Sequence, residues 1–209
     1  EGGKKRLQSF SPHTGELLGS VEALGAEEVQ AAMARARAAQ GEWAKLPIER
    51  RCEALLAFRD LIVDHTEDLV EAVVRETGKP RVEALLHDVA ATANFATYYI
   101  RRGPEILAPR ELEVGMQQNR RSYVHYGPLG VVAIISPWNF PLMIAAADVF
   151  AALVAGNASL RIKKPCAATL IRRGGRLDPV ADPALDVPQR SAPGLRRRLK
   201  KRKGKAQIT

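Results

Sequence analysis

A short polar segment between two apolar runs holds side chains that suit the binding of a small molecule. It reads Ser-Pro-Trp-Asn-Phe-Pro over residues 136–141, so an amide and two aromatic rings lie between two prolines. Because proline fixes φ and has no N–H donor, neither a strand nor a helix continues easily through the segment. We therefore predict an irregular turn. It either shapes a connection within the core or forms part of a ligand site.

The flanking runs predict the start of a parallel α/β layer. Residues 131–135, Val-Val-Ala-Ile-Ile, are typical of a strand that is buried on both faces. Residues 142–155 carry one charge, at Asp148, and the Gly-Asn pair that follows is a helix stop. A second strand is expected over 158–162. The turn then lies at the carboxyl end of a strand, where open α/β sheets bind their ligands.

Several motifs here resemble those of the NAD(P)-dependent aldehyde dehydrogenase superfamily. They are Gly-Pro-Leu-Gly-Val-Val at 127–132, Pro-Trp-Asn-Phe-Pro at 137–141 and Ala-Gly-Asn-Ala at 155–158, with Glu-Thr-Gly-Lys-Pro at 76–80 as a further landmark. The resemblance covers roughly residues 7–160. It implies an α/β fold, namely the amino-terminal part of a cofactor-binding domain in which helices wrap the start of a parallel Rossmann-like sheet.

The resemblance also implies roles for individual residues. In this family a cysteine thiolate attacks the aldehyde, hydride passes to NAD or NADP, and water releases the carboxylic acid. Asn139 is implied to supply the side-chain amide that stabilises the oxyanion, and its flanking prolines suit a preorganised donor. The alternative for Asn139 is a turn asparagine that bonds its own backbone. The implied cofactor-binding residues are Ile135, Ser136, Pro137, Trp138, Asn139 and Lys164.

Periodicity and resemblance together divide the chain into parts. Expected in chain order are a hairpin over 4–22, helices over 27–103, a β-hairpin over 111–127 and the βαβ start over 129–162. Residues 1–162 are then a partial cofactor-binding domain, and residues 163–209 are a tail. The second hairpin resembles the family segment that pairs with a partner subunit, so we expect homo-oligomer contacts there.

Helical spacing further predicts helix boundaries and side-chain environments. The expected boundary residues are Pro47 and Pro80 as helix starts, Thr66 as an N-cap, and Gly103-Pro104 as a stop. Arg50 and Arg51 are expected to be solvated, and Cys52 to be a small buried hydrophobe. The side chains expected to face inward on the helix that starts at Pro80 are Val82, Leu85, Leu86, Val89, Ala93 and Ala96.

The family pattern fails beyond the second strand. The lysine that normally ends this strand lies five residues past the asparagine of Ala-Gly-Asn, where this chain has Ile162, and Lys164 is the nearest match. Residues 161–209 carry a net charge of +12 against +9 for the whole chain, with the basic run LRRRLKKRKGK at 195–205. Such a segment cannot bury enough apolar area to offset the entropy of ordering, so 163–209 is expected to be disordered.

Two explanations of the basic tail remain open. Clustered Lys and Arg are the electrostatic signature of contact with nucleic acid or an acidic surface. Alternatively, the tail is a shifted reading frame appended to a truncated dehydrogenase, which the abrupt loss of pattern inside a core strand favours. The chain is therefore either part of an enzyme that oxidises a small aldehyde with NAD or NADP, or a non-catalytic binding module whose tail contacts nucleic acid nonspecifically.

The cysteines and the absence of apolar leaders predict a cytoplasmic protein. Cys52 and Cys166 lie far apart, with no CxxC or His/Cys cluster, so neither a disulfide framework nor a metal site is expected. No charged-then-apolar leader opens the sequence. A membrane span is discounted because two prolines, Asn139 and Asp148 interrupt the longest apolar region.

We predict that the purified 209-residue polypeptide reduces neither NAD nor NADP with small aliphatic or aromatic aldehydes. The family's cysteine lies in a Gly-Gln-x-Cys context and its base in Glu-Leu-Gly-Gly, and neither motif occurs in this sequence. Cofactor reduction followed by absorbance checks this expectation. Turnover that survives removal of contaminating enzymes would contradict it, and Cys52→Ser would then show whether that thiol is responsible.

Overall fold

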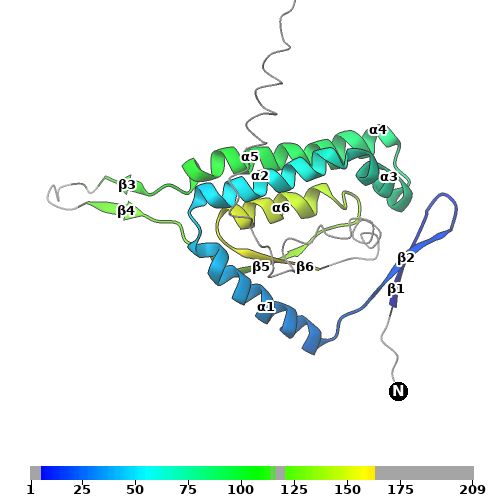
Figure 1. The fold of residues 1–209 in the computed structure, drawn as a ribbon, viewed down its shortest axis with the longest axis horizontal. Helices are drawn as coiled ribbons and strands as arrows, with labels where there is room; N and C mark the ends of the chain where they lie inside the picture. The colour runs from blue at the N-terminus through cyan, green and yellow to red at the C-terminus, as the bar shows by residue number, and fades with distance from the viewer. Residues whose placement is uncertain (1–5, 114, 116–120, 163–209) are drawn as a thin grey trace, which may run out of the picture.

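A two-stranded parallel sheet lies between helices in the computed structural model, which describes residues 6–113, 115 and 121–162. Strand β5 (Val131–Ile135) pairs in parallel with β6 (Ala158–Ile162). Helix α6 (Met143–Val154) connects the two strands and covers one face, and α1 (Ala26–Lys45) lies against the other (Figure 1). The predicted β–turn–α–β order is therefore confirmed.

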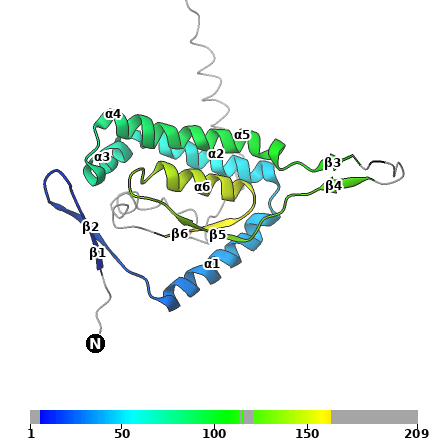
Figure 2. The same cartoon turned by 180° about the vertical axis from the view of Figure 1, so that it is seen from behind.

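A layer of helices covers α6 on the side away from the sheet. Helices α2 (Ile48–Asp64) and α5 (Ala91–Ile106) pack against each other and against α6. Helices α3 (Thr66–Thr77) and α4 (Arg81–Glu83) and the π-helix η1 (Ala84–Ala90) lie at one end of this layer (Figures 1 and 2). The fully buried Phe150 ring is centred 5.5 Å from that of Phe58 and joins α6 to α2. Burying a side chain of this size typically stabilises the fold by about 1.5–3 kcal/mol.

Two antiparallel hairpins flank this body. The first joins β1 (Arg6–Phe10) to β2 (Leu17–Glu22), and the second joins β3 (Arg110–Leu112) to β4 (Ser122–Val124). Both views show the second hairpin extending away from the helices (Figures 1 and 2). The two elements lie at the predicted ranges of 4–22 and 111–127, except that β3 begins one residue earlier; residues 4, 5, 114 and 116–120 lie outside the described residues.

The expectation that β5 is buried on both faces is wrong. Only Ile134 is buried in this strand, and Ile135 at its carboxyl end is 67% exposed. Among the described residues β6 is the sole neighbour of β5, so the other edge and the carboxyl end of the strand stay open. The run of β-branched residues indicated a strand correctly but could not indicate how much of it is covered.

Two of the predicted helix boundaries are also wrong. Thr66 is the first residue of α3 and does not cap it; its hydroxyl donates to the Val63 carbonyl at 2.7 Å instead. Helix α5 continues through Gly103-Pro104 to Ile106. A Cβ on Gly103 would lie 2.3 Å from Val154 Cγ1, so this glycine allows α5 and α6 to approach closely and does not end the helix.

The inward face of the helix predicted to start at Pro80 differs from the prediction, because η1 interrupts the α-helical segment between α4 and α5. Val89 and Ala96 are buried as expected, whereas Leu86 is 54% exposed and Val82 and Leu85 are also exposed. A π-helix bonds residue i to i+5 and so shifts the face that follows it relative to the α-helical period. Buried on this face are Ala84, Asp88, Val89 and Thr92.

Side chains from α1 and α2 cap the carboxyl end of α6. Trp43 Nε1 donates to the Leu153 carbonyl at 2.8 Å, and Arg51 Nε donates to the Val154 carbonyl at 3.2 Å. Arg51 Nη1 also donates to the Leu46 carbonyl at 2.7 Å, just past the end of α1. The last carbonyls of a helix lack the usual N–H donor four residues on, and the Leu153 carbonyl here also accepts the Gly156 N–H at 3.0 Å. A cation at this end of a helix also suits the helix dipole. The expectation of a solvated Arg51 is therefore wrong, and burial lowers the pKa of its guanidinium.

The Ala-Gly-Asn motif ties the end of α6 to the start of β5. Asn157 Nδ2 donates to the Ala152 carbonyl at 3.2 Å, and its Oδ1 accepts from the Gly130 N–H at 2.9 Å. The Ala158 N–H donates to the Gly130 carbonyl at 2.9 Å. Asn157 thus bonds both the helix end and the residue before β5, which fixes the connection that leads into β6.

We predict that Arg51→Met lowers the free energy of unfolding by about 1–3 kcal/mol, because it leaves carbonyls of two helix ends without their donor. The matched control is Arg50→Met. Arg50 is exposed and pairs with the exposed Glu53 at 2.9 Å, so its loss should cost at most about 1 kcal/mol. Urea unfolding of the two variants provides the comparison. Equal losses would refute the capping role of Arg51.

Candidate functional site

The turn between β5 and α6 is anchored at its end and open at its middle. Pro137, Trp138 and Asn139 are exposed, and Trp138 is 61% exposed. Phe140 is half-buried and Pro141 is buried, immediately before α6 begins. The turn lies at the carboxyl end of β5, next to the parallel strand β6. Its exposed residues therefore occupy the edge at which parallel sheets bind ligands.

Five of the six residues expected to bind the cofactor lie together in this stretch. Ile135 ends β5, Ser136 follows half-buried, and the remaining three form the exposed middle of the turn. Lys164 lies outside the described residues, as does the whole of the predicted tail at 163–209.

The Asn139 side chain lies at the surface of the described part of the structure. The side chain is exposed, and none of the described residues provides it with a hydrogen-bond partner. A turn asparagine that stabilised its own loop would bond a neighbouring backbone group. The geometry therefore gives no support to that alternative.

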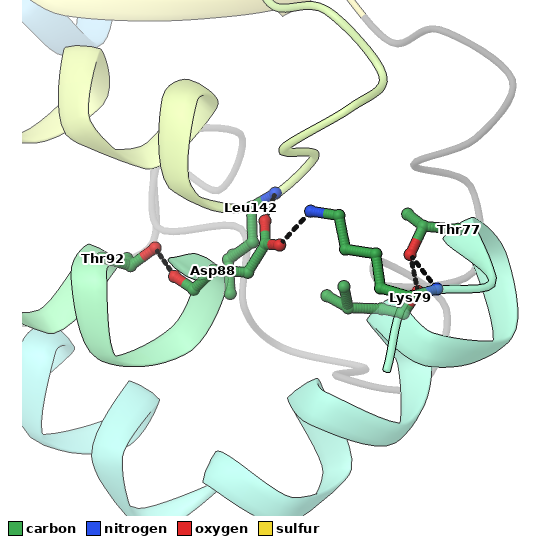
Figure 3. A network of polar contacts seen from close by, with 6 residues as sticks. Thr77, Lys79, Asp88, Thr92 and Leu142 are labelled. Atoms are coloured by element: carbon green, nitrogen blue, oxygen red, sulfur yellow. Dashed lines mark hydrogen bonds and ion pairs between the residues drawn. The ribbon is translucent and has the colours of Figure 1, made fainter. Parts of the chain in front are cut away.

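A buried ion pair lies beside the turn (Figure 3). Lys79 Nζ donates to Asp88 Oδ2 at 2.8 Å, with the Asp88 side chain fully buried and the Lys79 side chain 15% exposed. The Leu142 N–H, at the end of the turn, donates to Asp88 Oδ1 at 3.4 Å. Lys79 Nζ also lies 3.9 Å from the centre of the Phe140 ring, within the range of a cation–π contact. Both partners of the ion pair thus contact the turn.

Neighbouring threonines and a glycine hold the two charged residues in place. The Thr92 hydroxyl donates to the Asp88 carbonyl at 2.6 Å, and the Lys79 N–H donates to Thr77 Oγ1 at 3.3 Å (Figure 3). Gly78 ends α3 with φ at 72°, a left-handed conformation that glycine adopts without steric cost. This bend turns the chain out of α3 just before Lys79.

The segment that contains Lys79 stands out in the sequence, but Asp88 does not. Glu-Thr-Gly-Lys-Pro at 76–80 is recognisable only as a family landmark. Asp88 sits among apolar residues of the helix predicted to start at Pro80, and α-helical spacing gave no reason to place it inside. An acid among apolar helix residues, nine positions after a lysine, is the sequence signal that could have suggested the pair.

The described cysteine is unsuited to nucleophilic chemistry. Cys52 lies on α2 and is buried in the hydrophobic core, as predicted. Burial raises the pKa of its thiol, the opposite of what an activated nucleophile requires. Cys52 is therefore a packing residue.

A shallow apolar groove on the helical layer does not include the turn. It encloses about 300 Å³ and is lined by Val63, Thr66, Leu85, Val89, Ala90, Ala93, Asn94 and Thr97. None of the predicted site residues is among these. Within residues 6–113, 115 and 121–162, no group of three or more His, Cys, Asp or Glu could hold a metal ion, and no helix is long and apolar enough to cross a bilayer.

Known proteins resemble this chain in both sequence and structure. The sequence model of the aldehyde dehydrogenase family matches residues 1–171. A Mycobacterium ulcerans protein, provisionally named succinate-semialdehyde dehydrogenase [NADP(+)] 2, is 41% identical over 145 residues, which are 69% of this chain. The chain spans only 28% of the length of that relative.

Solved structures share the fold. The NADP-dependent glyceraldehyde-3-phosphate dehydrogenase from Bacillus halodurans, complexed with NADP, superimposes with a TM-score of 0.74 at 32% identity, over 86% of this chain and 38% of that one. An NAD-dependent benzaldehyde dehydrogenase from Corynebacterium glutamicum gives a TM-score of 0.72 at 27% identity, over 86% and 38% of the two chains.

These matches confirm the predicted fold, the start of an aldehyde dehydrogenase cofactor domain, and they favour the dehydrogenase hypothesis over the binding module. The family match extends past both ends of the expected range of 7–160. Because the family's sequence model matches most of its length and solved members share its fold, the chain belongs to the aldehyde dehydrogenase family.

Proposed function

We propose that this chain provides the oxyanion-binding amide and part of the dinucleotide site of an NAD(P)-dependent aldehyde dehydrogenase. The observation that carries the proposal is the exposed Asn139 amide, which no residue in the described part of the chain bonds, on an anchored turn at the carboxyl end of β5. The reaction is oxidation of an aldehyde to a carboxylic acid. The 41% identity with a relative named for this activity supports that reaction class.

Asn139 acts by donating a hydrogen bond to oxygen. When a thiolate adds to an aldehyde, the carbonyl oxygen gains negative charge. An N–H donor that is already in position stabilises that charge more than it stabilises the neutral carbonyl. Loss of one such donor typically costs about 10²–10³-fold in kcat. Pro137 and Pro141, which flank the amide, limit the backbone rearrangement that this donor needs.

The residues before Asn139 fit a dinucleotide. Ile135 and Trp138 present exposed apolar surface at the carboxyl edge of a parallel strand, which is the usual position of nucleotide cofactors in open α/β sheets. NAD or NADP, when bound, accepts the hydride from the substrate. In this proposal Ile135, Ser136, Pro137 and Trp138 line its site, and Lys164 contacts its ribose. The names of the Mycobacterium and Bacillus proteins favour NADP over NAD.

A hybrid enzyme tests the proposal. Residues 6–162 of this chain replace the matching segment of the Bacillus halodurans dehydrogenase, so that the host supplies the nucleophile and the rest of the site. We predict aldehyde-dependent NADPH formation by the hybrid. Asn139→Ala should then lower kcat by about 10²–10³-fold with little change in KM, because the lost bond forms chiefly in the transition state.

The control is Asn94→Ala in the same hybrid. Asn94 is an exposed amide on α5 and is not part of the turn, so kcat should not change. A folded hybrid that binds NADP but makes no NADPH would argue against the proposed function. An active hybrid in which both substitutions leave kcat unchanged would remove Asn139 from the mechanism.

The β3–β4 hairpin is our proposed contact between subunits. It extends away from the body (Figure 1). Its exposed side chains include Leu112, Tyr123 and the nearby Tyr126. Apolar groups on a projecting strand pair gain from burial against a second copy. Leu112→Glu should shift the hybrid toward monomer in analytical ultracentrifugation; an unchanged sedimentation coefficient would count against this contact. A cytoplasmic location also belongs to the proposal, and fractionation of expressing cells tests it.

A further inference from the structure

We propose that Lys79 and Asp88 are positioning residues that fix the conformation of the turn carrying Asn139. Their catalytic consequence rests on the function proposed above, but the structural role is independent of it. The two residues come from the α3–α4 connection and from η1, well before the turn in sequence, and both reach it. Asp88 is fully buried and Lys79 is only 15% exposed, so the pair contributes little to the surface that a ligand would meet.

Asp88 supplies a side-chain acceptor at the amino end of α6, where the side chain of the N-cap residue offers none. The N-cap position of α6 is Leu142, whose side chain makes no capping hydrogen bond. Leucine is a poor residue there, because the first N–H groups of a helix need an acceptor from outside the helix. Asp88 Oδ1 accepts from the Leu142 N–H at 3.4 Å, and a negative charge at this end also suits the helix dipole. The acceptor for the Leu142 N–H therefore comes from η1, another element of the fold.

Lys79 holds the turn on the other side of Pro141. Its ammonium lies 3.9 Å from the centre of the Phe140 ring while it donates to Asp88. Phe140 directly follows Asn139 in the chain. The ion pair thus contacts the residue before and the residue after the buried Pro141. Because Phe140 is bonded directly to Asn139, holding the Phe140 ring in place also restricts the orientation of Asn139.

The cost of this arrangement indicates a positioning role. Replacing a buried ion pair with well-packed apolar residues is often neutral or stabilising, so a fold gains little stability from such a pair. The pair here also depends on η1, a seven-residue π-helix, to bring Asp88 to the buried face. Segments of this kind are rare and frequently mark functional sites. Apolar side chains could fill this space, but they could not accept the Leu142 N–H.

Hydrogen exchange of the 209-residue polypeptide tests the proposal without any enzymatic assay. In the wild-type protein the Leu142 amide should exchange at least about tenfold more slowly than in an unstructured peptide, because it is bonded to a buried carboxylate. Lys79→Met and Asp88→Asn should each speed exchange over residues 138–142 by at least about tenfold, with little change in α1. Lys79→Arg, which keeps the charge and the contact with the ring, should restore most of the protection.

The matched control is Lys45→Met, which removes the exposed lysine paired with Glu42 at 2.7 Å. It should leave exchange over residues 138–142 unchanged. A purely stabilising role predicts a different result, in which Lys79→Met speeds exchange equally in the turn, in α1 and in α3. That uniform acceleration would overturn the proposal.

The wild-type measurement keeps the proposal falsifiable if a variant fails to fold. A Leu142 amide that exchanges at the rate of an unstructured peptide would overturn it without any substitution. The outcome is also separate from that of the hybrid enzyme. If the Lys79 and Asp88 variants lose protection of the turn but the hybrid is inactive, the positioning role stands and the proposed function is rejected. If the hybrid is active but the variants keep that protection, the function stands and the positioning role is rejected.

Discussion

The structure depends on one buried carboxylate that serves two elements at once. Asp88 is fully buried and bonds both the Lys79 ammonium and the backbone N–H of Leu142, the residue before α6. An isolated charge in this position would be too costly to bury, and the Lys79 ammonium supplies the opposite charge at 2.8 Å. The lysine in turn packs on Phe140, and the turn between β5 and α6 is held between the two.

Helix α6 is consequently fixed at both ends by groups from outside it. Asp88 bonds its amino end, and Trp43 and Arg51 bond its carboxyl end through Leu153 and Val154. Asn157 then joins that end to the residue before β5. These bonds fix the position of α6 relative to β5 and β6, although its N-cap residue makes no side-chain capping bond. The exposed amide of Asn139 extends from the middle of the turn between β5 and α6.

Much of this arrangement could be predicted from local pattern, and the remainder could not for identifiable reasons. The prolines around Asn139 and the Gly-Asn after the apolar helix predicted the turn and the helix end correctly, because these residues restrict their own backbone. Arg51 and Asp88 were missed, because their roles depend on partners about 103 and 54 residues away in sequence. The π-helix changes the period of its own segment, so an α-helical wheel misplaced Leu86. The open edge of β5 depends on which strands lie beside it, which a run of β-branched residues does not specify.

A crystal structure of the hybrid enzyme, with NADP and an aldehyde trapped on the host's cysteine, tests the central claim most directly. The claim is that the turn holds the Asn139 amide where negative charge develops on the aldehyde oxygen. We predict that Asn139 Nδ2 lies about 2.7–3.1 Å from that oxygen, with the Lys79–Asp88 pair intact beside the turn. An amide that instead bonds its own backbone, or that points away from the trapped oxygen, would contradict the account.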